Sequence, residues 1–307
     1  MEKSLVKPYI AIIVGVISVS FSAILVRLSE APSGVIAFYR MLFSCLILLP
    51  VFLKGSIKQL KSIAKKDWLF STIAGIFLAF HFILWFESLR YTSVASSTVL
   101  VTLQPLFAFI GTYFIFKERV TGSGIISIFL AIAGSVLISA SDFTAEGKAL
   151  YGDMLALTAC ALATAYLIIG QLVRKRLTLT TYTFVVYSVC SFTLFIYVLL
   201  KNEKLVSYSK YEWILFILLA VIPTLLGHSL FNWAIEWVST TTISMAILFE
   251  PIGATVLAYY FFGETLGSWQ FIGSSLVLIG LGMFLINGKS KRKRNKQSNI
   301  GKKELFE

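Results

Sequence analysis

The chain has 307 residues, of which 57% are hydrophobic and only 14% are charged, and its formal net charge is +12. A soluble domain is nearer half apolar and a quarter charged, so these values and a mean hydropathy of +0.84 predict an integral membrane protein. With two histidines and with all three cysteines inside apolar runs, we expect no metal site, no cofactor and no disulfide framework.

Apolar runs long enough to cross a bilayer recur along the whole chain. A helix needs about 20 apolar residues to cross a hydrocarbon core of about 30 Å. The sequence predicts an all-α integral membrane protein with ten transmembrane helices, at residues 8–28, 33–53, 68–89, 94–116, 122–141, 151–172, 181–200, 212–237, 240–262 and 267–287. The first run is too long for a cleaved signal peptide. The loops are too short for a soluble catalytic domain, and the chain has no GxxxxGK[ST] phosphate loop for ATP hydrolysis.

The distribution of Lys and Arg predicts the orientation in the membrane. These residues gather before the first span, at 54–66, 117–119 and 174–176, and in the tail 288–307, whereas the alternate loops hold few. By the positive-inside rule, both termini are cytoplasmic and the protein lies in the cytoplasmic (inner) membrane. The basic tail is therefore expected to lie near anionic lipid and not on nucleic acid. The expected partners are the bilayer and a small-molecule substrate, with the chain a monomer or a homodimer.

The two halves of the chain carry an internal repeat. Residues of the first half recur 146 or 147 positions later: Pro105 at Pro251, Ala108 at Ala254, Glu118 at Glu264, Gly134 at Gly280 and His81 at His228. With five helices in each half, the second half must enter the membrane in the opposite direction. The sequence thus predicts a 5+5 inverted repeat around a central cavity, with repeats 8–141 and 151–287, an architecture of secondary transporters. A duplication retained only for packing is the alternative.

Several motifs resemble the EamA-type branch of the drug/metabolite transporter superfamily over about residues 8–287. The resemblance rests on Glu250-Pro251 with Ala254, Phe262-Gly263-Glu264-Thr265-Leu266, Gln104-Pro105 through Lys117-Glu118-Arg119, Gly152-Asp153 before Leu155-Ala156-Leu157, and Pro32 followed by Tyr39-Arg40. It implies a ten-helix transporter with an inverted repeat, often an exporter of amino acids, other metabolites or drugs. The chain departs from the family pattern at Gln104, where Glu is favoured, and at Ser20-Phe21-Ser22, which lacks the usual Trp or Asn.

Polar side chains inside the spans are the candidates for the transport site. A charged side chain at the bilayer centre costs about 2.5–3.5 kcal/mol on insertion scales, so it usually faces protein or a cavity. Thr224, His228, Asn232 and Glu236 recur every four residues, which predicts one polar face directed toward the cavity. The candidate substrate-binding residues are Tyr39, Arg40, His81, Trp85, Gln104, His228, Asn232 and Glu250.

Three of these candidates have more than one interpretation. Glu250, directly before Pro251 near the middle of its span, could bind a cation or carry a proton, or it could be a protonated carboxyl bonded to a neighbouring helix. His228 could relay protons with Glu250, or it could be an interhelical hydrogen-bonding group. Arg40 could clamp a substrate carboxylate, or it could pair with Glu87 or extend toward the surface.

The sequence therefore predicts a secondary transporter that moves small metabolites by alternating access. Export of amino acids or related compounds, with or without proton coupling, is the leading hypothesis, and multidrug efflux is the alternative. A channel fits the inverted repeat less well. An intramembrane aspartyl protease would need two aspartates within the spans, but Asp67, Asp142 and Asp153 lie at span ends or in loops, so we expect no enzyme.

Overall fold

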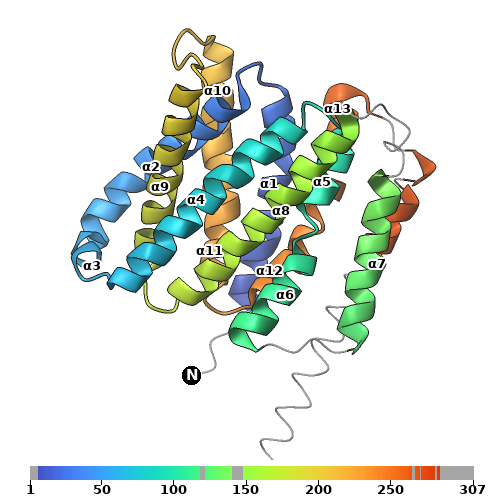
Figure 1. Ribbon diagram of the computed structural model, residues 1–307, viewed down its shortest axis with the longest axis horizontal. Helices are drawn as coiled ribbons and strands as arrows, with labels where there is room; N and C mark the ends of the chain where they lie inside the picture. The colour runs from blue at the N-terminus through green and yellow to red at the C-terminus, as the bar shows by residue number, and fades with distance from the viewer. Residues whose placement is uncertain are drawn as a thin grey trace, which may run out of the picture.

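A computed structural model describes residues 6–117, 122–139, 148–264, 267–269, 271–280 and 282–283, and the regular structure within these ranges is entirely helical (Figure 1). Glu118, Arg119, Thr265, Leu266 and the basic tail lie outside the described residues. The helices are α1 (Val6–Arg27), α2 (Ser33–Gly55), α3 (Ile57–Lys61), α4 (Lys65–Ser88), α5 (Val94–Val101), α6 (Gln104–Phe116), α7 (Gly122–Ser139), α8 (Lys148–Val173), α9 (Leu179–Leu200), α10 (Lys210–Leu219), the π-helix η1 (Ala220–His228), α11 (Ser229–Ala234), α12 (Thr240–Ile247) and α13 (Glu250–Phe262).

Eight stretches of these helices are long and apolar enough to cross a membrane. They correspond to eight of the ten predicted spans. The other two predicted spans, 122–141 and 267–287, are only partly within the described residues, which there include the shorter apolar helices Gly122–Gly134 and Phe271–Gly280. The multi-spanning helical architecture is confirmed, and the count of ten stays a prediction.

Two of the spans are each broken into two helices at equivalent positions. The breaks separate α5 from α6 and α12 from α13, and the bounds of the second pair follow those of the first by 146 residues. Pro105 and Pro251 lie in the first turns of α6 and α13, where the missing N–H costs least. Ser93 and Ser239 cap α5 and α12 with their side chains. The sequence repeat is therefore also a repeat of local structure.

A reciprocal close contact joins α7 to the helix at 271–280. A Cβ atom on Gly134 would lie 2.5 Å from the carbonyl oxygen of Gly273, and one on Gly280 would lie 2.6 Å from that of Ser127. Gly134 and Gly280 are 146 positions apart, and so are Ser127 and Gly273. The two contacts therefore interchange when the halves of the chain are exchanged. Glycine is needed at both positions because the backbones approach each other so closely.

One span changes its helical register in the middle. It runs from α10 through η1 to α11, and Pro223 lies within η1. Thr224 Oγ1 donates to the carbonyl of Leu219 at 2.9 Å, five residues earlier, and Ser229 N–H bonds to the carbonyl of Thr224. Such π-turns are frequent at functional sites because they redirect side chains. Here the wider turn sets the directions of Thr224 and His228.

Ion pairs join helix ends that lie at the same end of the bundle. We call the end that carries residues 54–66 and 174–176 the basic end, and the other the opposite end. At the basic end, Arg176 lies 2.5 Å from Asp67. At the opposite end, Arg27 lies 2.5 Å from Glu264. Between the ends, α4 and α8 lie side by side (Figure 1) and form a large part of the packed interior.

Candidate transport site

Arg40 lies in the interior where α1, α2, α4 and η1 meet. Its side chain is fully buried. Nε donates to Thr224 Oγ1 at 2.7 Å, and Nη1 donates to Ser22 Oγ at 2.8 Å. The guanidinium carbon also lies 4.3 Å from the centre of the Phe82 ring, in a cation–π contact. Both direct hydrogen-bond partners of this charge are therefore neutral hydroxyls.

Two alternatives to substrate binding were open for Arg40, namely an ion pair with Glu87 and extension toward the surface, and the structure shows neither. Full burial excludes extension of the side chain to the surface. The pairing with Glu87 is wrong, because Glu87 instead lies 3.9 Å from Arg90. Arg40 takes part in none of the four ion pairs formed among the described residues. Its Nη2 atom is buried without a hydrogen-bond partner in that part of the chain.

The two histidines face each other across the interior. The ring centres of His81 and His228 are 6.4 Å apart, and Trp85 stacks on His81 at 5.8 Å. His81 Nδ1 lies 3.0 Å from the carbonyl oxygen of Ala159 on α8. Because a carbonyl oxygen only accepts, Nδ1 of His81 carries the hydrogen in this contact. The repeat thus brings its two equivalent histidines within one shared cluster.

Glu250 is the carboxylate that interacts electrostatically with Arg40 in this cluster. It begins α13, is buried, and interacts electrostatically with Arg40 without a direct ion pair. Its backbone carbonyl accepts a hydrogen bond from Ser20 Oγ at 3.4 Å. Within the described residues its carboxyl oxygens have no hydrogen-bond partner, so the predicted bond to a neighbouring helix is not found. Gln104 begins α6 at the equivalent position, and its Oε1 atom is also buried and unpartnered among those residues.

Asn232 contacts a residue that sequence reasoning missed. Its Nδ2 atom donates to the hydroxyl of Tyr166 on α8, and the Tyr166 ring lies 6.4 Å from that of His228. Tyr187 adds a second buried hydroxyl, 3.1 Å from Ser229 Oγ. A tyrosine inside an apolar run has the same pattern as any core aromatic residue. The available signal was its hydroxyl, which needs a partner when it is buried.

Tyr39 lies apart from the cluster although it precedes Arg40. Its ring stacks on Phe216 at 5.1 Å, and its hydroxyl donates to the carbonyl of Leu205. Consecutive residues of a helix project in different directions. Tyr39 therefore packs α2 against α10, while Arg40 points into the bundle.

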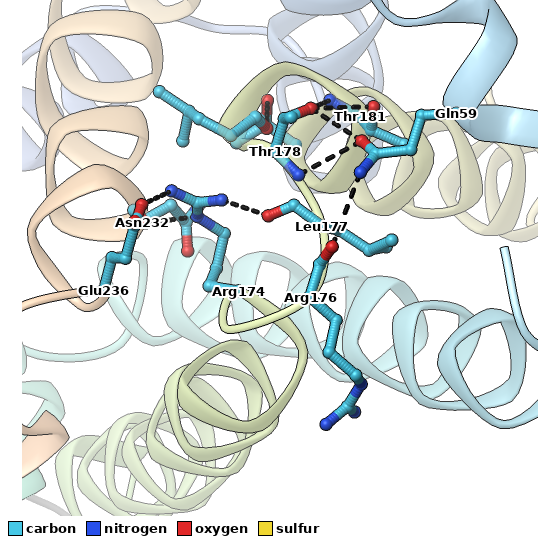
Figure 2. Close-up of polar contacts among 10 residues, drawn as sticks. Gln59, Arg174, Arg176, Leu177, Thr178, Thr181, Asn232 and Glu236 are labelled. Carbon is cyan, nitrogen blue, oxygen red and sulfur yellow. Dashed lines mark hydrogen bonds and ion pairs between the residues drawn. The ribbon is translucent and has the colours of Figure 1, made fainter. Parts of the chain in front are cut away.

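Glu236, the last residue of the predicted polar face, lies at the basic end (Figure 2). Its carboxylate accepts from Arg174 Nη2 at 2.8 Å. Arg174 Nε also donates to the carbonyl of Asn232 at 2.9 Å, and Nη1 donates to that of Leu177. Burial lowers the pKa of Arg174, and the neighbouring Glu236 carboxylate opposes this effect. One guanidinium thus joins the end of α8, the following turn and the end of α11.

A cavity of about 340 Å³ opens at the opposite end of the bundle. Its lining consists of Val26, Arg27, Ser29, Glu30, Ser33, Ile36, Phe86, Leu89 and Arg90. Ile36 lies one helical turn before Arg40, and the Phe86 ring centre is 5.7 Å from the Arg40 guanidinium carbon. Phe86 therefore lies against both this cavity and Arg40. The predicted central cavity itself stays a prediction.

These features define the class of protein. Apolar spans carry buried polar groups that cost free energy in a membrane, and two spans are discontinuous where such groups begin their second helices. Membrane proteins that carry solutes combine these properties.

The chain belongs to the EamA-like transporter family, whose model matches residues 6–140 and 150–286. It is 28% identical over 266 residues to an uncharacterized transporter of Clostridium kluyveri, covering 83% of each chain. It is 24% identical over 264 residues to the uncharacterized transporter YxxF of Bacillus subtilis, covering 86% of this chain and 84% of that one. It is 24% identical over 286 residues to the uncharacterized inner membrane transporter YhbE of Escherichia coli K12, covering 90% and 86%. The family predicted from the sequence motifs is confirmed.

A solved structure supports the fold independently of close sequence similarity. A protein described as "Crystal structure of protein" superposes with a TM-score of 0.73 over 92% of this chain and 98% of that one, at 15% identity. That similarity concerns the fold alone. Together, the family and the helices define a multi-pass membrane transporter.

Proposed function

We propose that the protein is a secondary transporter that exports small polar metabolites, amino acids or related compounds, by alternating access between two inverted five-helix halves. The observation that carries this proposal is the pair of broken spans, α5–α6 and α12–α13, repeated at an interval of 146 residues. Broken helices near the midplane provide backbone and side-chain groups to a solute in transporters of this design.

The cargo in this proposal binds at the interior cluster of Arg40, His81, Trp85, His228 and Glu250. These residues come from α2, α4, η1 and α13, and so from both halves of the chain. A rocking movement of one half against the other would change which end of the bundle leads to the cluster. With the basic end in the cytoplasm, export begins at the end that carries the Arg174–Glu236 pair and finishes at the cavity beside Arg27.

Because the chain has no phosphate loop for ATP hydrolysis, either the gradient of the cargo or proton exchange supplies the energy, and we propose proton exchange. Glu250 and His228 are the proposed proton carriers. Glu250 is buried, and among the described residues its carboxyl has no hydrogen-bond partner that would fix one protonation state. His228 lies next to His81 and Tyr166, which allows a proton to pass to or from a neighbouring group.

Comparison of secreted and retained metabolites in cells with and without the gene tests the transport proposal. The expected result is accumulation of one compound class inside cells that lack the gene. Purified protein in vesicles should then show saturable uptake and counterflow of that class. Single-channel currents would overturn the carrier mechanism.

A pH gradient across the same vesicles tests the coupling. Glu250→Gln should abolish gradient-driven accumulation. Glu264→Gln, just after the C-terminus of α13, should retain it. Full gradient-driven accumulation by Glu250→Gln would show that Glu250 is not the proton carrier.

A further inference from the structure

We propose that Arg40 is the binding group for an anionic part of the cargo, most simply a carboxylate, which in export is released past Phe86 into the opposite-end cavity. This inference rests on the proposed transport function and specifies the chemical class of its cargo. Its starting point is a buried cation whose direct partners are uncharged.

The hydrogen bonds of Arg40 orient its charge without neutralising it. Thr224 Oγ1 uses its own hydrogen in the bond to Leu219 and accepts from Arg40 Nε, and Ser22 Oγ accepts from Nη1. Neutral acceptors of this kind leave the net positive charge of the guanidinium in place. The third nitrogen, Nη2, is buried and has no partner among the described residues. A guanidinium with a free edge is suited to a carboxylate or a similar planar anion.

The groups around Arg40 favour an anion. Glu250 is the carboxylate that interacts with it electrostatically, but the two side chains form no direct ion pair. His81 and His228 also interact with Arg40, and neither supplies a negative charge that would neutralise it. The other groups that interact are Tyr187 and Cys190, which are neutral when protonated. A buried charge such as Arg40 is unfavourable without a partner of opposite charge. An anion that binds beside Arg40 would supply that partner.

The route to Arg40 is short and has an identifiable barrier. The lining of the opposite-end cavity includes the charged residues Arg27, Glu30 and Arg90 and the apolar residues Ile36 and Phe86. The guanidinium carbon of Arg40 lies 5.7 Å beyond the Phe86 ring centre. Phe86 lies against both the cavity and Arg40, so rotation of its side chain is the movement that we propose connects them.

Binding of simple carboxylates by the purified full chain tests this inference. The probes are propionate and benzoate, with propionamide and benzamide as neutral compounds of matched shape. The acids should raise the unfolding temperature of the wild-type protein and the amides should not. Arg40→Lys should bind the acids roughly tenfold more weakly, since a lysine lacks the planar fork. Arg40→Gln should lose the effect, and Arg27→Gln, which removes a cavity-lining charge already paired with Glu264, should keep it.

Two variants of Ser22 test the same inference with Arg40 present. Ser22→Asp places a carboxylate beside Nη1 of Arg40, so the internal ion pair should compete with the probe and remove its effect. Ser22→Asn has nearly the same shape as Ser22→Asp but is neutral, so it should retain binding. This pair keeps the test decisive if Arg40→Gln does not fold.

Three results would overturn the inference: equal effects of acids and amides, equal effects on the wild type and Arg40→Gln, or no effect of any carboxylate on the wild type. The transport proposal fails separately. If carboxylates bind at Arg40 but the vesicles move no solute, transport is wrong. If the transported compounds carry no anionic group, transport stands and the role of Arg40 is wrong.

Discussion

Arg174 and Glu236 form an ion pair of 2.8 Å at the basic end, in which the arginine side chain is 2% exposed and the glutamate side chain 38%. At the opposite end, Arg27 and Glu264 form a pair whose side chains are 37% and 27% exposed. Arg27 and Arg174 are 147 positions apart, the interval that also separates the two histidines. The equivalent arginines of the two halves thus form ion pairs at opposite ends of the bundle. The side chain of Arg174 is buried and that of Arg27 is exposed.

This difference predicts unequal effects on stability. Glu236→Gln should lower the free energy of unfolding by about 1–2 kcal/mol, because it weakens a charge-assisted hydrogen bond of a buried guanidinium. Glu264→Gln should cost about 0–1 kcal/mol, as is usual for exposed pairs. Denaturant unfolding of the purified protein in one detergent measures both. Equal losses would show that burial of Arg174 does not strengthen its pair.

The Arg174–Glu236 pair should also control access from the basic end. Gly170 lies one turn before Arg174 on α8, and a Cβ atom there would lie 3.1 Å from the Tyr182 hydroxyl and 3.7 Å from Asn232 Oδ1. In a background with Cys45, Cys160 and Cys190 replaced by Ser, Gly170→Cys reports on that interior position. Adding Glu236→Gln should raise its labelling rate several-fold by a membrane-impermeant maleimide applied from the basic side. Glu264→Gln is the matched control, and an unchanged rate with Glu236→Gln would contradict the closure.

Much of this fold could be predicted because its determinants are local. Apolar length fixes the spans, and Pro105 and Pro251 mark the places where two of them restart. The interval between His81 and His228 predicted their equivalence, and the structure brings their rings together. Each of these signals depends on residues within one helix or on a constant offset along the chain.

The partners of Arg40 could not be predicted in the same way. Its hydrogen bonds reach Ser22 and Thr224, which lie 18 and 184 positions away. Periodicity placed Thr224 on a polar face, but the direction of its hydroxyl depends on the π-turn that contains Pro223. Pairing with Glu87 was plausible by charge alone and is wrong because Glu87 lies beside Arg90. Packing between distant helices decided this part of the site.

The carboxyl of Glu203, in the turn after α9, should make the free energy of unfolding of the protein depend on pH. Burial and the nearby Glu87 carboxylate raise the pKa of Glu203, while Arg90 and Lys201 oppose the shift. The folded state therefore binds this proton more tightly than the unfolded state does. The resulting stabilisation is present at pH values below the ordinary range of glutamate, and it is lost as the pH rises through the raised pKa.

Glu203→Gln should consequently unfold at a higher temperature than the wild type at neutral pH, and the advantage should disappear on acidification. Unfolding temperatures measured across a pH series give the difference directly. Glu30→Gln, an exposed substitution at the same end of the bundle, is the control. An advantage that grows on acidification would have the wrong sign for a raised pKa.

The reciprocal contact between α7 and the helix at 271–280 gives a test of the repeat itself. Gly134→Ala and Gly280→Ala would each place a methyl group against a backbone oxygen, at 2.5 Å from Gly273 and 2.6 Å from Ser127. Each should lower the free energy of unfolding by about 1–3 kcal/mol, because backbone cannot move aside as a side-chain end can. Gly122→Ala, with no atom within 4 Å of its Cβ, should be neutral. Since both substitutions separate the same pair of helices, the double variant should lose less than the sum of the single losses. Strict additivity would show that the two glycines do not share one interface.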